Sequence, residues 1–389
     1  MALDTGFANT VKRELRRIVS RPLYIACVLL VPAFVTFFML DFLKDGLPTR
    51  VPCAVVDLDR TEMSRSVIQT LDALQSAEVV AVYDSYTEAQ NSIKKGETLG
   101  FFVIPENFAQ DALSMRGPQI SLYSNYTYLI PGTFVYKGML TTANLAKGAL
   151  AKGLLESAGV PEESVKVALV PVENHVHPLN NPQLNYNIYL SNSFIPCALA
   201  LMILIMTTYC IGTEIKHKTS VEWLKGAHNS FFIALTGKLL PYTVLFSLMG
   251  IASSAVMYRY IGFPMHAGPL QLILTMILFV MATQAFGVLL CMVIPNFRFA
   301  LSGASLLGIL SFSLAGFSFP AEHMYRGVEI FSWLLPIRYY FLIYVDQFLN
   351  GIDLYYSRFY YAALLAFLLL PFFFWKRLKK MCLDPVYLP

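Results

Sequence analysis

Gly212–His228, GTEIKHKTSVEWLKGAH, is a short charged segment between two long apolar ones. It carries five charged residues, whereas residues 174–213 before it and 239–258 after it contain no Asp, Glu, Lys or Arg. About 20 apolar residues suffice for a helix to cross a bilayer. The pattern therefore predicts two membrane spans joined by a polar segment on one side of the membrane.

The same alternation of apolar and charged segments runs through the whole chain of 389 residues, which is 56% hydrophobic and 14% charged. Soluble proteins carry about 25% charged residues. We therefore expect a mainly α-helical membrane protein. Its six transmembrane helices are predicted at Pro22–Leu40, Ile188–Gly212, Phe231–Tyr258, Leu270–Ile294, Phe299–Phe319 and Phe359–Trp375. Apolar Ile330–Leu349 contains Arg338 and Asp346, so it is interpreted as part of an external re-entrant segment, 320–356.

Lys and Arg near the ends of the spans predict the orientation. Thirteen lie on the side of Gly212–His228 and four on the other, which places both termini in the cytoplasm. Residues 1–21 read as a basic amphipathic helix suited to lie on the inner leaflet, with Phe7, Val11, Leu15 and Ile18 at helical spacing. Residues 376–389 read as a cytoplasmic tail. These basic clusters account for the net charge of +4 without a nucleic-acid partner.

Residues 41–187, between spans one and two, are predicted to form an inserted extracytoplasmic α/β domain. Strands are expected at 51–59, 77–84, 98–105 and 119–129, with helices at 62–75, 86–96 and 133–159. Cys53 is the only cysteine of this region, so it has no disulfide partner there. An impermeant thiol reagent should reach Cys53 from outside, provided that the domain exposes it, but never Cys382.

Catalytic and metal sites are poorly supported. Asp57 and Asp59 resemble an acid pair, but they end a strand, where turn and cap roles are commoner. His175 and His177 alternate without a third ligand, which favours surface histidines over a metal site. No phosphate-binding loop or protease motif occurs. We expect no catalytic residue, no metal and no cofactor bound by this chain.

Ionisable residues are scarce inside the spans. Only Lys238 interrupts them, near a cytoplasmic end, whereas ion-coupled transporters need such groups as proton or cation sites. Energy for any uphill transport is then expected from another subunit that docks on the cytoplasmic side. The segment 213–229 is the candidate docking helix. The alternative is an amphipathic helix that rests on lipid headgroups.

These residues resemble the ABC-2-type permeases of ATP-binding cassette exporters. The match in the loop comprises Glu214, the segment Ser220–Leu224 with Thr219 beside it, and Gly237, Lys238 and Pro241 entering the next span. The segments VVDLDRTEMSRSV, GETLGFFVIPENF and LAGFSFPAEHM match in the same order as in the family. So does the entry to span two, with Asn181, Pro182, Asn185 and Tyr186. The resemblance covers nearly the whole chain.

The resemblance implies a half-size permease that forms a homodimer or heterodimer and borrows two ATPase subunits, which bind ATP and Mg. It also implies that 213–229 is the coupling helix seated on the ATPase. The residues expected to carry that contact are Glu214, Lys218, Thr219, Glu222, Trp223 and Leu224.

The resulting hypothesis is an exporter permease in a bacterial cytoplasmic (inner) membrane, with a periplasmic adaptor and an outer-membrane channel as further candidate partners. Aromatic runs in spans one and five favour a lipophilic or amphipathic cargo, unless those rings face lipid. Two alternatives remain open. One is an ion-coupled secondary transporter, and the other is a non-transporting receptor or assembly scaffold.

Overall fold

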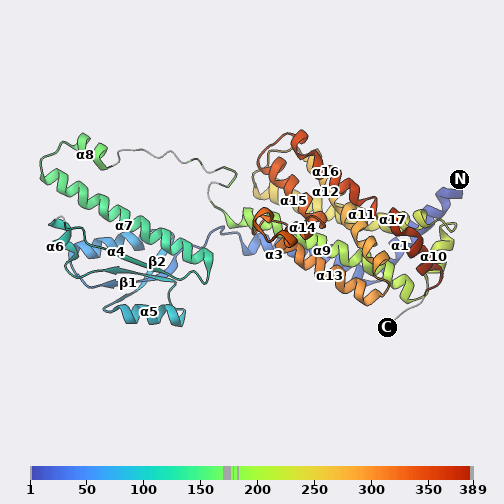
Figure 1. Cartoon of the computed structure of the whole chain (residues 1–389), viewed down its shortest axis with the longest axis horizontal. Coiled ribbons are helices and arrows are strands. Elements are labelled where there is room, and N and C mark those ends of the chain that lie inside the picture. The colour runs from blue at the N-terminus through green and yellow to red at the C-terminus, as the bar shows by residue number, and fades with distance from the viewer. Residues whose placement is uncertain (1, 115, 170–176, 178, 182–183, 386–389) are drawn as a thin grey trace. The chain divides into compact units, whose positions relative to one another are not determined.

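The computed structural model describes residues 2–114, 116–169, 177, 179–181 and 184–385. The chain divides into two compact units (Figure 1). We call Met1–Gly46 with Pro178–Pro389 the helical unit, and Leu47–His177 the sheet unit.

Within the described residues of the helical unit, six helical runs are long and apolar enough to cross a membrane, in agreement with the six predicted spans. The first joins α2 (Pro22–Ile25), η1 (Ala26–Leu30) and α3 (Val31–Phe42); the others are α9 (Tyr186–Lys216), α11 with η2 (Phe231–Ala255 and Val256–Ile261), α12 (Pro269–Val293), α13 (Phe297–Leu314) and α16 with α17 (Leu354–Phe367 and Leu370–Leu383). The α9 and α12 helices are the most buried. The core of the unit is therefore built around them.

The α1 helix (Ala2–Ser20) packs against α11. Its buried face runs through Thr10, Glu14 and Ile18, four residues apart, as neighbours on one side of a helix must be. Leu15 is 46% exposed on another side. The bundle therefore covers Ile18 of the predicted apolar stripe and leaves Leu15 on the outside, and contact of that outer side with lipid stays a prediction.

The segment after span five contains η3 (Ala321–His323), α14 (Arg326–Ser332), α15 (Pro336–Ile343) and η4 (Tyr344–Leu349). The α14 helix and the continuous α15–η4 run meet at a bend of 83°. Such a bend belongs either to a re-entrant segment, as predicted, or to a broken seventh span.

The last helix continues beyond the predicted end of span six. The α17 helix runs through the basic residues to Leu383, so residues 376–383 of the predicted tail are helical, and their place in the cytoplasm stays a prediction. This extension lets α17 pack against α10 (Ser220–Gly226), the helix of the charged segment. The α1, α10 and α17 labels accordingly lie at the same end of the helical unit (Figure 1).

The sheet unit contains the strands and helices predicted from the sequence. Its four strands, in the order β2-β1-β3-β4, are β1 (Val51–Asp57), β2 (Ala77–Tyr83), β3 (Gly100–Ile104) and the shorter, antiparallel β4 (Ser121–Ser124). Its helices are α4 (Glu62–Asp72), α5 (Tyr86–Lys95), α6 (Phe108–Leu113), α7 (Leu129–Ser157) and α8 (Glu162–Leu169). The α7 helix covers one face of the sheet and α5 the other (Figure 1).

Both cysteines proposed as topology reporters are buried. Cys53 has no exposed surface, and burial raises the pKa of its thiol to about 12. Cys382 is equally enclosed. Neither thiol is open to a reagent in the folded chain, so a labelling test needs introduced cysteines.

Candidate functional site

The charged segment lies where five elements meet: α1, the end of α9, α10, the start of α11 and the end of α17. The chain leaves α9 at His217 and reverses at Lys218, whose φ of 58° is left-handed. Thr219 directly precedes α10, and its amide donates back to the Glu214 carbonyl, 2.9 Å away. The tight reversal holds α10 close to the end of α9.

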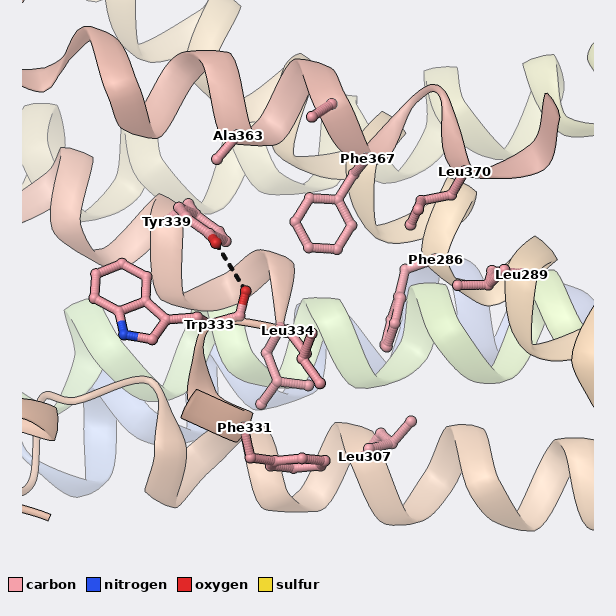
Figure 2. A pocket seen from close by; sticks show the side chains of 12 residues that line it. Phe286, Leu289, Leu307, Phe331, Trp333, Leu334, Tyr339, Ala363, Phe367 and Leu370 are labelled. Carbon is pink, nitrogen blue, oxygen red and sulfur yellow. Dashed lines mark hydrogen bonds between the residues drawn. The ribbon is translucent and has the colours of Figure 1, made fainter. Parts of the chain in front are cut away.

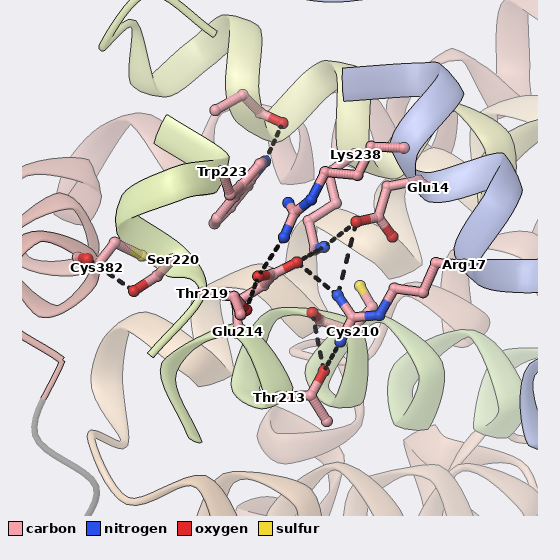
Figure 3. A network of polar contacts seen from close by, with 12 residues as sticks. Glu14, Arg17, Cys210, Thr213, Glu214, Thr219, Ser220, Trp223, Lys238 and Cys382 are labelled. Carbon is pink, nitrogen blue, oxygen red and sulfur yellow. Dashed lines mark hydrogen bonds and ion pairs between the residues drawn. The ribbon is translucent and has the colours of Figure 1, made fainter. Parts of the chain in front are cut away.

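Glu214 is the centre of a buried ionic cluster (Figure 3). Its carboxylate accepts hydrogen bonds from Arg13 Nη2 at 2.9 Å, Lys238 Nζ at 2.8 Å and Arg17 Nη1. The Thr219 hydroxyl also donates to it. A buried charge is tolerated only when it is paired and hydrogen-bonded. Glu214, predicted to contact a partner, is instead satisfied within its own chain.

Lys238 links Glu214 to a second acid. Its ammonium donates to Glu14 as well, and the Tyr242 hydroxyl lies 3.3 Å from the other Glu14 oxygen. Glu14, Glu214 and Lys238 are all fully buried. Lys238, isolated in the sequence, thus has two carboxylate partners on α1 and α9.

Arg17 completes the cluster from α1. It donates to Glu214 and, through Nη2, to Thr213 Oγ1 at 2.8 Å. Burial alone would lower the pKa of Arg17, but the groups around it that can carry negative charge, Glu214 first among them, together outweigh burial, and the pKa lies above its ordinary value. With Arg13, Arg17 and Lys238 against Glu14 and Glu214, the cluster has three cations and two anions.

Trp223 and Leu224 are buried inside the chain, each about 1% exposed. Trp223 Nε1 donates to the Ala234 carbonyl at 3.1 Å, and the Lys238 ammonium lies 5.0 Å from the indole centroid. Ser220 Oγ donates to the Cys382 carbonyl of α17 at 2.7 Å. The expectation that these apolar side chains face a partner therefore needs correction: they fix α10 to its own bundle.

Four of the side chains left on the outside of the segment are charged. Lys218 and Glu222, both predicted contact residues, are exposed, and so are Lys216 and Lys225. We call these four residues the docking face. It is a predominantly basic surface: Lys216 ends α9, Lys218 lies in the reversal, and Glu222 and Lys225 lie on α10. The other side of α10 packs against α9, α11 and α17.

Two motif residues at the start of span three explain how α1 comes so close. A Cβ on Gly237 would lie 3.0 Å from the Thr10 side chain, so only glycine lets the helices meet here without displacement. Lys238, the next residue, then reaches Glu14. Pro241 is buried within α11 one turn later.

The motif at the entry to span two builds a helix start. The Asn185 side chain accepts from the amide of Asn187 at 2.8 Å and caps α9, while Asn181 accepts from the Asn185 amide at 2.8 Å. The Tyr186 amide donates to the Gly46 carbonyl at 2.6 Å. These contacts join the end of span one to the start of span two. Pro182 lies outside the described residues.

The helical unit also contains an apolar pocket of about 430 Å³ between α12, α13, α16, α17 and the bent segment (Figure 2). Phe286, Phe331, Trp333 and Phe367 contribute aromatic rings to it. The Tyr339 hydroxyl, at its edge, donates to the Trp333 carbonyl at 2.8 Å. Sequence reasoning did not single out these rings, because they come from α12, the end of α14 and α16, which lie apart in the sequence.

The acid pair of the sheet unit has structural roles. Asp57 accepts from the Arg60 amide at 3.0 Å and from Ser64 Oγ at 2.9 Å, and Asp59 accepts from the Ala109 amide at 3.2 Å. His175 lies outside the described residues. Among the residues that are described, no group of three His, Cys, Asp or Glu residues is placed to hold a metal ion.

Sequence reasoning missed Glu14, Arg13 and Arg17 as members of the ionic cluster. A signal was present, because Glu14 is the single acid within the basic run KRELRR. An acid at the same helical spacing as buried Thr10 and Ile18 indicates a polar face that needs a cationic partner.

Comparison with known proteins agrees with the resemblance seen in the sequence. The chain is 20% identical over 333 residues to the "Probable multidrug ABC transporter permease YbhR" of Escherichia coli K12, covering 85% of this chain and 86% of that protein. The same values hold for the protein of that name from Escherichia coli O157:H7. A model of the ABC-2 family transporter proteins matches residues 22–375. With nearly the whole chain matched, including all of spans one to five, this membrane protein belongs to the ABC-2 family of transporter proteins.

Proposed function

We propose that the chain is the permease subunit of an ATP-binding cassette exporter. It moves a lipophilic or amphipathic substrate out across a bacterial cytoplasmic membrane, as a homodimer or heterodimer, with energy from a separate ATPase. Family membership and the distant relative named as a multidrug permease support the class. One observation carries the proposed coupling to an ATPase. The docking face is exposed, while the buried side of the same segment is fixed to three spans.

The buried cluster suits a coupling element because it makes the parts move together. Separation of α1, α9 and α11 from one another would leave Glu214 or Lys238 buried without its partner, which is strongly unfavourable. The α10 helix is tied to this cluster by the Thr219 hydroxyl, which donates to Glu214, and by Trp223, which donates to the Ala234 carbonyl and lies against Lys238. A displacement of α10 by the ATPase is therefore transmitted to spans two and three rather than absorbed in a loose loop. ATP and Mg bind on the partner, which hydrolyses ATP.

The docking face is tested by reversal of one charge at a time. Glu222→Arg and Lys225→Glu should each reduce copurification of the ATPase by about tenfold or more, because each leaves unfavourable charge pairs at a matched surface. Glu106→Arg, an exposed reversal in the sheet unit, is the matched control and should have no effect. Membrane abundance should be equal in all four proteins, since none of the changes touches a span.

The alternative, a helix that rests on lipid headgroups, makes a different prediction. Arg at position 222 would then tighten contact with anionic lipid, Glu at 225 would loosen it, and ATPase copurification would stay at the wild-type level for both. That pattern, with normal export, would exclude a docking role. Efflux by the chain alone, driven by an ion gradient, would favour the secondary transporter instead.

Orientation is tested with introduced cysteines on exposed sites. We expect both termini in the cytoplasm and the sheet unit outside. Thr87→Cys should therefore react with a membrane-impermeant maleimide in intact cells, whereas Lys380→Cys should react only after lysis. Labelling of Lys380→Cys in intact cells would reverse the orientation, and failure of both in lysed cells would show that the sites are covered.

A further inference from the structure

A second apolar pocket of the helical unit contains polar groups without partners. It has a volume of about 570 Å³ and lies between one face of α11, one face of α12 and the α16–α17 break. Ser247 of α11 and Gln284 of α12 line it. They are 6% and 3% exposed, yet neither Ser247 Oγ nor Gln284 Nε2 has a hydrogen-bond partner within the described residues.

Neither orientation of the Gln284 side-chain amide gives both of its polar atoms a hydrogen-bond partner. Its Oε1 accepts from Thr243 Oγ1 at 2.6 Å, and that hydroxyl also lies 3.0 Å from the Leu239 carbonyl. If the amide is turned over, Nε2 donates to Thr243 and Oε1 faces the pocket instead. One polar end of Gln284 is unsatisfied either way. Buried polar groups in folded proteins are normally hydrogen-bonded, so the exception calls for a partner from outside the chain.

The position and lining of the pocket narrow the chemistry of that partner. Thr243 and Ser247 lie near the middle of the 31-residue span Phe231–Ile261. Among the described residues, the lining includes no Asp, Glu, Lys, Arg or His. A charged ligand would lose its hydration without gaining a counter-charge there. An ordinary phospholipid places its polar groups at the interface and offers only hydrocarbon at this depth.

We infer that the pocket binds an uncharged lipophilic molecule that carries a hydrogen-bonding oxygen within its apolar body, such as a carbonyl or hydroxyl. Leu240, Leu248 and Met281 supply apolar contact, and Gln284 with Ser247 recognises the oxygen. Identification of this ligand as cargo rests on the proposed export function, but its binding does not.

The binding is tested on the purified permease in nanodiscs, without an ATPase. Nile red, a neutral dye with a ring carbonyl, serves as the probe, and diphenylhexatriene serves as a hydrocarbon without an acceptor. Trp375 provides an intrinsic reporter, because its ring lies 5.6 Å from that of Phe232 at one end of the pocket. Saturable quenching of Trp375 fluorescence by Nile red, beyond the partition of the dye into empty nanodiscs, is expected.

Substitutions in the pocket then distinguish specific recognition of Nile red from partition of the dye into lipid. Gln284→Leu should weaken Nile red binding about tenfold, because the buried donor is lost, while the hydrocarbon probe binds as before. Thr283→Val is the control: Thr283 is the neighbouring buried polar residue, but it bonds the Phe279 carbonyl and does not line the pocket. Val244→Trp, at a half-exposed lining position, should block both probes.

Equal Nile red affinity in wild type and Gln284→Leu, with both proteins monodisperse, would overturn the inference. So would a preference for the cationic trimethylammonium derivative of diphenylhexatriene over Nile red. If the permease binds Nile red but does not copurify with an ATPase, the result counts against the proposed function alone. If it copurifies with an ATPase but does not bind Nile red, the inferred binding pocket is excluded and the proposed function stands.

Discussion

Two ion-paired clusters hold opposite ends of the helical unit, and they differ in their access to water. The first surrounds Glu214, near Gly212, which contacts Phe297 at the start of α13. The second surrounds Arg338, whose Nη1 donates at 3.0 Å to the Ala315 carbonyl just past the end of α13. Eighteen residues of helix separate the two clusters.

The first cluster buries both acids together with the Lys238 ammonium, whereas the second buries only the Arg338 guanidinium. Glu14, Glu214 and Lys238 have no exposed side-chain surface. Arg338 is 2% exposed, but its partner Glu322, at 2.8 Å, is 58% exposed. Water can thus reach the acid of the second cluster, whereas in the first it reaches only the arginines, with Arg13 36% and Arg17 12% exposed, and neither acid. The removal of a single ion should therefore cost much more at the Glu214 end than at the Arg338 end.

The largest effect is expected from Lys238→Met. It leaves two buried carboxylates sharing only the two arginines of α1, and the breaking of a buried pair costs about 3–5 kcal/mol. The free energy of unfolding in detergent, or the melting temperature where unfolding is irreversible, should fall accordingly. Lys12→Met, an exposed lysine on α1, is the control and should change little.

A second substitution tests whether charge imbalance is the cause. Glu14→Gln added to Lys238→Met removes the carboxylate that is left with only Arg17 as a nearby cation, 3.7 Å away, so the double variant should recover part of the loss. A double variant that is less stable than Lys238→Met would show that packing, not charge, dominates the cluster.

An intermediate effect is expected from Arg338→Met. The Ala315 carbonyl loses its donor, at a cost of about 1–3 kcal/mol, while Glu322 remains solvated. Contact of the guanidinium with Trp333, 4.9 Å from the ring centroid, is lost as well. Arg326→Met, on an exposed arginine of the same segment, is the control. The free energy of unfolding, measured as for Lys238→Met, should fall, but by less than it does in that variant. A larger fall than that of Lys238→Met would reverse the comparison.

The spans were predictable and the clusters were not, for one physical reason. A span is recognised from consecutive residues, because the bilayer excludes charge over a continuous length. The Lys238–Glu14 pair joins residues 224 positions apart, and no local spacing encodes such a contact. Lys238 stood out in the sequence as the lone charge within a span, but its partners did not.

The α/β elements of the sheet unit were predicted well because their signals are local. Alternate β1 residues face two cores, Cys53 and Val55 toward α7, Ala54 and Val56 toward α5. A strand buried on both faces reads as a continuous apolar run, as VPCAVV does. Trp223 shows the limit: an indole among charged residues predicts a burial site but not whether its own chain or a partner supplies it.

The smallest effect is expected from Glu322→Gln. The hydrogen bond from its own backbone amide is the main cause that holds the pKa of Glu322 below its ordinary value of 4.5, and Arg338 adds to it. Its stabilising effect is therefore fully present above pH 4.5 and is lost as the pH falls through the lower folded-state pKa. Because the carboxylate is 58% exposed, solvent screening limits the effect at neutral pH to less than about 1 kcal/mol. Melting temperatures of wild type and Glu322→Gln should differ slightly at pH 7 and converge below pH 4.5. A loss as large as that of Arg338→Met would mean that Glu322, rather than the Ala315 carbonyl, is the partner that holds Arg338 in place.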